Sequence, residues 1–200
     1  MAQLISQILE ELKAVQVAYE SDRDNEAMQR VIDGYLQLLN EAPDDPEITF
    51  QLGTAYLQVG CYGAAMVYLH RVTDFWPDNY HVWSNLGCCY RSLHILPEAR
   101  ECFLKALMFD ERAETYSNLA SSYINEDNPA AGMPYAQKAM ELAPDSAKGR
   151  WNAALLMLEL GNWQAGFTLY DAGFFCNERQ MRNYSNERPD STPWWLGEAA

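Results

Sequence analysis

The chain has 200 residues, of which 48% are apolar and 21% are charged, and its 28 acidic against 14 basic side chains leave a formal charge of −14. This composition is typical of a folded globular protein and differs from that of disordered segments. Such an acidic excess argues against nucleic acid as a partner, because binding to a phosphate backbone depends on Lys and Arg.

The sequence also argues against a membrane or secreted protein. No apolar run approaches the roughly 18 residues that a membrane-spanning helix needs, and the opening MAQLISQILEELK has acidic residues where a secretory signal has basic ones. The cysteines are odd in number and lack the paired spacing of a zinc site. We therefore expect reduced cysteines, a cytoplasmic location and no membrane partner.

Residues 1–45 are expected to form an N-terminal capping pair of helices. The first helix is predicted to begin near Gln3 and to end at SDRDN, residues 21–25. This pair fits the later repeat only in the spacing of Ala18, Tyr35, Leu38 and Pro43. Terminal units of repeat arrays are commonly atypical and polar on their outer face, as this segment is.

From residue 46 onward the sequence repeats with a period of 34 or 33 residues. Leu52-Gly53 aligns with Leu86-Gly87, and the series continues at Leu119-Ala120 and Ala153-Ala154. A repeat of this length predicts one pair of helices per unit, and each unit must stack on its neighbours to bury its apolar face. The predicted units span 46–79, 80–112, 113–146 and 147–180.

Small residues recur at two positions of the repeat, one on each helix of a pair. We expect them to mark the points at which helices approach closely, with aromatic side chains filling the space beside them. The small residues are Gly53, Gly87, Ala120 and Ala154 on first helices and Ala65, Ala99 and Gly132 on second helices.

The unit Trp83-x-x-Leu86-Gly87-x-x-Tyr90, followed by Ala99-x-x-x-Phe103, resembles the tetratricopeptide repeat (TPR), a helix-turn-helix unit of 34 residues. The resemblance implies an all-α fold, namely a right-handed α-solenoid of stacked helix pairs. It also implies a role in protein–protein interaction, in which the first helices line a concave surface that receives a partner.

The sequence contains no recognisable catalytic grouping. Its three histidines are scattered along the repeats, and it lacks both a Gly-x-Ser-x-Gly motif and a glycine-rich phosphate loop. We expect no enzymatic activity, no metal site and no cofactor.

A carboxamide residue precedes the small-residue pair in each of the four units, at Gln51, Asn85, Asn118 and Asn152. A carboxamide carries both donors and an acceptor, so it can bind a peptide main chain without reading its side chains. We predict that these residues form a ladder that holds an extended peptide in the concave groove. The alternative, which the sequence leaves open, is that each amide braces a neighbouring helix.

The same first helices supply the predicted lining of the groove. The groove is expected to be apolar at both ends and small and polar in the middle, with Arg91 as its clearest cation. The lining residues are Phe50, Thr54, Leu57, Ser84, Cys88, Arg91, Ser117, Ser121, Ile124, Trp151, Leu155 and Leu158.

Two features resemble glycosyltransferase systems. An Asn or Gln before Leu-Gly is similar to the repeats of O-linked N-acetylglucosamine transferase, in which such a ladder holds the peptide substrate. A second resemblance is to the junction in bacterial repeat proteins that carry a glycosyltransferase domain after the array, and it rests on Gly161-Asn162-Trp163, Gly166, Tyr170 and Pro193-Trp194-Trp195-Leu196-Gly197-Glu198.

The main hypothesis is therefore a non-enzymatic scaffold that binds an extended peptide of a protein partner. One alternative, implied by the resemblance, is a substrate-recognition module of a glycosyltransferase whose catalytic domain is absent from this chain. Another is an acidic chaperone for a basic client. Residues 181–200 are expected to form an extended tail, and the tryptophans near the C-terminal end could also pair two copies as a homo-oligomer; these are Trp151, Trp163, Trp194 and Trp195.

Overall fold

The computed structural model describes residues 2–22 and 24–175. Within these ranges the chain forms ten α-helices and no strand, which confirms the predicted all-α class. The predicted tail at 181–200 lies outside the described residues. The chain divides into two compact units, which we call the N-terminal unit, Met1–Glu111, and the C-terminal unit, Arg112–Ala200.

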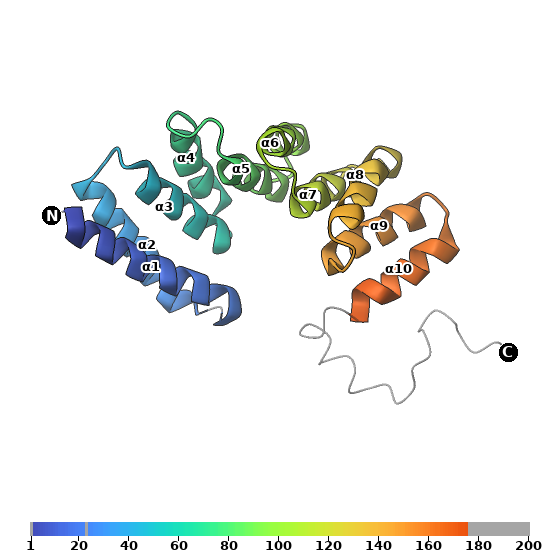
Figure 1. Cartoon of the computed structure of the whole chain (residues 1–200), viewed down its shortest axis with the longest axis horizontal. Coiled ribbons are helices and arrows are strands. Elements are labelled where there is room, and N and C mark those ends of the chain that lie inside the picture. Colours follow the sequence, from blue (N-terminus) through green and yellow to red (C-terminus); the bar gives the residue numbers. More distant parts are fainter. Residues whose placement is uncertain (1, 23, 176–200) are drawn as a thin grey trace. The chain divides into compact units, whose positions relative to one another are not determined.

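The N-terminal unit contains the first six helices, in which each helix packs against the next (Figure 1). The first helices of successive pairs also contact one another, α1 with α3 and α3 with α5. The helices are α1 (Ala2–Asp22), α2 (Asn25–Glu41), α3 (Pro46–Gln58), α4 (Tyr62–Thr73), α5 (Tyr80–Ser92) and α6 (Leu96–Phe109). The bounds of α1 confirm the predicted long first helix.

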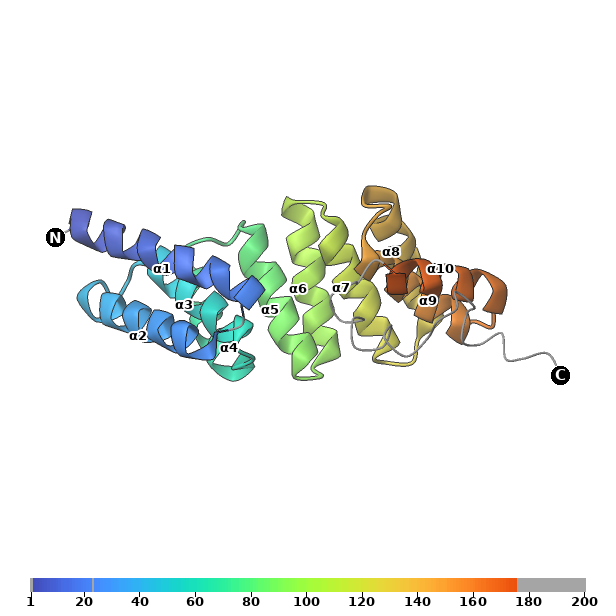
Figure 2. The same cartoon turned by 90° about the horizontal axis from the view of Figure 1, so that it is seen from below.

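The C-terminal unit contains four described helices, which pack in the same order (Figure 2). Here too the first helices of successive pairs, α7 and α9, contact each other. The helices are α7 (Ala113–Ile124), α8 (Pro129–Leu142), α9 (Ala147–Glu159) and α10 (Trp163–Phe175).

Polar caps and prolines in the loops explain where most first helices begin. Asp45 accepts hydrogen bonds from the backbone N–H groups of Glu47 and Ile48, and Asn79 does the same at the start of α5. Ser146 caps α9 through the N–H of Gly149. These side chains satisfy N–H groups that a helix start leaves without partners.

The turn within each later helix pair depends on one residue with a left-handed backbone. In each turn the next N–H bonds back to a helix carbonyl, as from Cys61 to Tyr56 at 2.9 Å, which closes a Schellman-type helix end. The left-handed residues, with their φ angles, are Gly60 (79°), His94 (58°), Asp127 (56°) and Gly161 (79°). Only glycine adopts this conformation without cost, so the two side-chain-bearing residues are strained.

Small residues lie where paired helices meet, as the repeat predicted. A Cβ atom added to Gly87 would lie 2.5 Å from the Phe103 ring, and one added to Gly53 would lie 2.9 Å from the Leu69 side chain. The alanines at the same two repeat positions are fully buried; they are Ala65, Ala99, Ala120 and Ala154. The helices therefore approach at distances that leave no room for larger side chains there.

Candidate functional site

The two amides of the N-terminal unit, Gln51 on α3 and Asn85 on α5, are half-buried. The Gln51 Nε2 donates to Glu47 Oε1 at 2.9 Å, and that carboxylate also pairs with Lys13 of α1 at 2.8 Å. The Asn85 Nδ2 donates to Thr54 Oγ1 at 3.2 Å, which joins α5 to α3. Each amide thus uses its NH₂ group within the fold, while neither side-chain oxygen accepts a hydrogen bond from the described residues.

The two amides of the C-terminal unit are buried, which corrects the prediction of a solvent-facing amide at these positions. Asn118 on α7 is 1% exposed, and its Oδ1 accepts a 2.7 Å hydrogen bond from the Lys148 ammonium of α9. Asn152 on α9 is 6% exposed, and its Nδ2 donates to the Ser117 backbone carbonyl at 2.7 Å. Both residues therefore brace α7 against α9, which is the alternative that the sequence left open.

The predicted lining residues fall into two classes. Ser84 and Ser117 are buried, at 8% and 1% exposure, so they do not present a surface to a ligand in this structure. The others are half-buried on first helices: Phe50, Thr54, Leu57, Cys88 and Arg91 in the N-terminal unit, and Ser121, Ile124, Trp151, Leu155 and Leu158 in the C-terminal unit.

Aromatic pairs hold two of the apolar lining residues in place. The Phe50 ring packs against Trp76 with centroids 5.8 Å apart, and the Trp151 ring packs against Tyr170 at 4.5 Å. Rings fixed in this way offer apolar area to a partner without a large loss of side-chain freedom on binding.

Arg91 is the polar lining residue with the least satisfied side chain. It lies on the same face of α5 as Ser84 and Cys88, and its Nε is buried without a hydrogen-bond partner. Among the described residues the only other buried side-chain atom of this kind is Ser117 Oγ. Because nearly all buried polar groups in folded proteins are paired, an unpaired guanidinium N–H on this surface calls for an explanation.

The sequence missed the partners of the amides. The signal for Gln51 was present, since an acid four residues earlier on a helix can accept its hydrogen bond. The signal for Asn118 was not, because its bond to Lys148 joins two helices separated by a whole repeat.

The described cysteines are free thiols, and burial raises the pKa of Cys89 to about 12 and that of Cys102 to about 11. In the described ranges no cluster of three or more His, Cys, Asp or Glu is arranged to hold a metal ion. No helix in the same ranges has the length and apolar character to cross a membrane.

One predicted unit is matched by a known family. Residues 113–146 match the tetratricopeptide repeat. The chain is also 27% identical over 150 residues to protein FlbA of Caulobacter vibrioides, a similarity that covers 74% of this chain and 25% of FlbA. The chain therefore spans about a quarter of the length of this curated relative.

Several solved structures share the fold. One structure of MamA is 14% identical with a TM-score of 0.68 and covers 94% of this chain and all of its own. TTC0263 of Thermus thermophilus, a thermophilic TPR protein, is 16% identical with a TM-score of 0.70 over 86% of this chain and 93% of its own. YrrB, a TPR protein with an unusual peptide-binding site, is 16% identical with a TM-score of 0.60 over 72% and 75%. The chain therefore has the all-helical, α-solenoid fold of tetratricopeptide repeat proteins, and its repeat at 113–146 is matched by that family in sequence as well.

Proposed function

We propose that the chain is a non-enzymatic protein-interaction scaffold that binds an extended peptide of a partner along its first helices. The peptide contacts that we infer lie in the N-terminal unit, where Gln51, Asn85 and Arg91 keep polar groups that the fold does not use. The free thiols of the described cysteines suit a cytoplasmic location, which is part of the same proposal.

The observation that carries the proposal is the unpaired Nε of Arg91. An unsatisfied buried donor costs about 1–3 kcal/mol, so an acceptor supplied by a ligand would remove this penalty on binding. The guanidinium offers five N–H donors in a plane and suits either a peptide carbonyl or a carboxylate. The rest of the chain supplies few competing cations near neutral pH, since its formal charge is −14.

The two amides complement Arg91, because their free oxygens are acceptors for peptide N–H groups. Packed helices lie roughly 8–10 Å apart, and an extended peptide advances about 3.3–3.6 Å per residue. Acceptors on α3 and α5 would thus meet about every third residue of the ligand. The half-buried Phe50 and Leu57 would add apolar contact on α3. The peptide-binding site described for YrrB, a protein of the same fold, supports this kind of function.

The proposal is tested with random peptides displayed on phage and selected on the whole chain. Arg91→Ala should weaken the selected peptides roughly tenfold or more, because a hydrogen bond to a charged group contributes about 1.5–3 kcal/mol. Arg91→Lys should retain part of the affinity through its charge. Arg30→Ala, which removes the same charge from an exposed position on α2, is the control. Equal affinities for Arg91→Ala and Arg30→Ala would contradict the proposal.

The same selection separates the two alternative functions. A recognition module for a glycosyltransferase should enrich peptides rich in Ser and Thr hydroxyls, and the partial coverage of FlbA is compatible with such a module within a longer protein. An acidic chaperone should enrich basic peptides whose affinity falls steeply with salt. Peptides with neither bias would favour the simple scaffold.

A further inference from the structure

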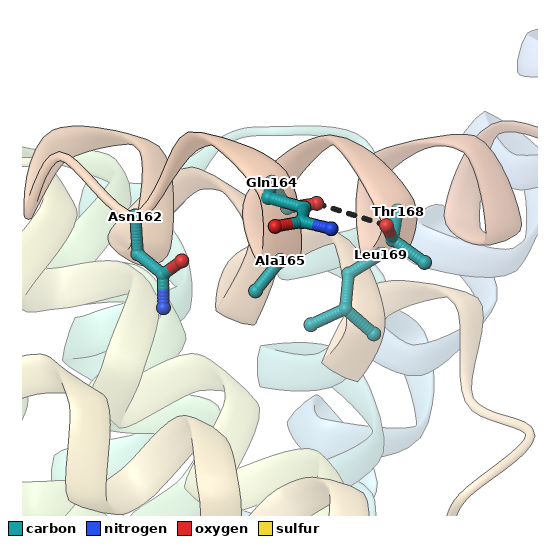
Figure 3. Close-up of a pocket in the computed structure, with 5 residues that line it drawn as sticks. All are labelled: Asn162, Gln164, Ala165, Thr168 and Leu169. Atoms are coloured by element: carbon teal, nitrogen blue, oxygen red, sulfur yellow. Dashed lines mark hydrogen bonds between the residues drawn. The ribbon is translucent and has the colours of Figure 1, made fainter.

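A shallow hollow of about 410 Å³ lies on one flank of α10, the last helix that the structure describes. Figure 3 shows the side chains of Asn162, Ala165 and Leu169 pointing to the same side of this helix. The Thr168 hydroxyl at its edge donates to the Gln164 carbonyl at 2.8 Å. All the described lining residues come from α10 and the residue before it, so the hollow is a half-built site whose other wall must come from elsewhere.

Large apolar side chains are exposed beside this hollow. Leu160, in the turn before α10, is 48% exposed, and Trp163, in the first turn of α10, is 61% exposed. The Trp163 ring packs against the Phe167 ring of the same helix, with centroids 6.4 Å apart. A tryptophan left so open exposes apolar surface whose burial would be strongly favourable.

Two carboxylates without a cationic partner lie at the same end of the C-terminal unit. Burial and the nearby charge of Asp127 both raise the pKa of Glu159, which is the residue just before Leu160. Neither carboxylate forms an ion pair with a described residue. This end of the unit therefore presents an apolar surface bordered by unbalanced negative charge.

The segment that follows α10 has the complementary chemistry. Residues 176–200 carry three arginines, at 179, 182 and 188, followed by the apolar run Trp194-Trp195-Leu196. The segment is also long enough, because α10 has 13 residues. At 1.5 Å per residue it is about 20 Å long, a distance that some six extended residues cover. Trp194 is 19 residues beyond Phe175, so it can return to the start of α10 with chain to spare.

We propose that residues 176–200 fold back on the C-terminal unit and place Trp194 and Trp195 against the flank of α10 formed by Ala165 and Leu169. The arginines of the segment then lie toward the carboxylates of Asp127 and Glu159. The docked segment supplies the missing wall of the hollow and covers Leu160 and Trp163. A site of this kind is an intramolecular closure of the repeat array, and it is independent of peptide binding at Arg91.

The test uses the full chain labelled with 5-fluorotryptophan, whose six tryptophans give separate fluorine signals that single substitutions assign. The signals of Trp194 and Trp195 should show a small solvent isotope shift, and this shielding should persist on roughly tenfold dilution, since an intramolecular contact does not depend on concentration. Thr168→Arg, at an exposed position on the edge of the hollow, should restore the full isotope shift.

Val67→Arg is the matched control, because Val67 is an exposed helix residue, 61% accessible, in the N-terminal unit. It should leave the Trp194 and Trp195 signals unchanged. Full solvent exposure of both tryptophans in the parent chain would overturn the proposal, as would shielding that survives Thr168→Arg and Ala165→Arg. Shielding lost on dilution would assign the surface to a second copy of the chain and would also overturn it.

Discussion

In the N-terminal unit the glycines that allow paired helices to meet lie on the first helix, whereas in the C-terminal unit they lie on the second. Gly87 of α5 faces the Phe103 ring of α6, while Gly166 of α10 faces Leu158 of α9 at 2.7 Å from an added Cβ. The opposite position holds alanine in both cases, at Ala99 and Ala154. The repeat therefore specifies the room between two helices, and either helix can provide it.

The units differ also in what they do with the amide before the small residue. In the N-terminal unit the amides stay half-exposed and keep a free oxygen, whereas in the C-terminal unit they are enclosed between α7 and α9. One repeat position thus keeps a polar group within reach of solvent in one unit and braces two helices in the other.

Adding a methyl group at the closest helix contact should have the largest effect. Gly87→Ala should destabilise the N-terminal unit by about 1–3 kcal/mol, because its Cβ would press on a buried aromatic ring. Urea unfolding measures the loss, and Phe103→Leu in the same chain should recover part of it. Gly63→Ala, where nothing lies within 4 Å, is the control and should stabilise the chain slightly. Equal effects at the two glycines would remove the packing argument.

Removing the amides should separate the two units energetically. Asn152→Ala leaves the buried Ser117 carbonyl without its 2.7 Å hydrogen bond and should cost about 1–3 kcal/mol of unfolding free energy. Asn85→Ala should cost less than about 1 kcal/mol, since Thr54 can turn to water. Urea midpoints of the two variants check this order. A larger loss for Asn85→Ala would show that the burial difference does not govern stability.

Relieving backbone strain should have the same effect in both units. His94→Gly and Asp127→Gly should each stabilise the chain by up to about 1 kcal/mol, because both native residues hold a positive φ. Gly60→Ala and Gly161→Ala should destabilise it for the converse reason. Thermal unfolding of the four variants measures these changes, and a destabilised His94→Gly would point to a side-chain contact that outweighs the strain.

Acidification should produce the smallest effect and should act on the N-terminal unit. Burial alone would raise the pKa of Glu47, but hydrogen bonds from Lys13 and Gln51 outweigh it and hold this pKa below its ordinary value of 4.5. The pair therefore stabilises the fold above pH 4.5 and loses its contribution as the pH falls through the lowered pKa. The loss should stay below about 1 kcal/mol, since the pair is partly exposed.

Glu47→Gln tests this dependence, because it keeps the shape of the side chain and removes its charge. The unfolding free energy of this variant should change less than that of the parent chain below pH 4.5. Identical pH curves for the two chains would show that the ion pair with Lys13 contributes nothing to stability.

The helices, their caps and the positions of close approach could be read from the sequence, because each depends on residues near one another in the chain. Asp45 caps the helix that it precedes, and the 34-residue period places Gly53 and Gly87 at equivalent points. The glycine turns at 60 and 161 follow the same logic, whereas His94 and Asp127 adopt the left-handed conformation without the residue type that announces it.

The amino-acid pattern is sufficient to establish the repeating helical pair and the face of each helix that packs. The role of each polar side chain on that face depends instead on tertiary contacts, because an amide turns toward whichever partner a neighbouring helix brings within reach. Lys148 reaches Asn118 and the Ser117 carbonyl reaches Asn152, whereas no residue of the described chain reaches Arg91 Nε. These distances depend on how one helix pair lies on the next, and a one-dimensional pattern does not contain that information.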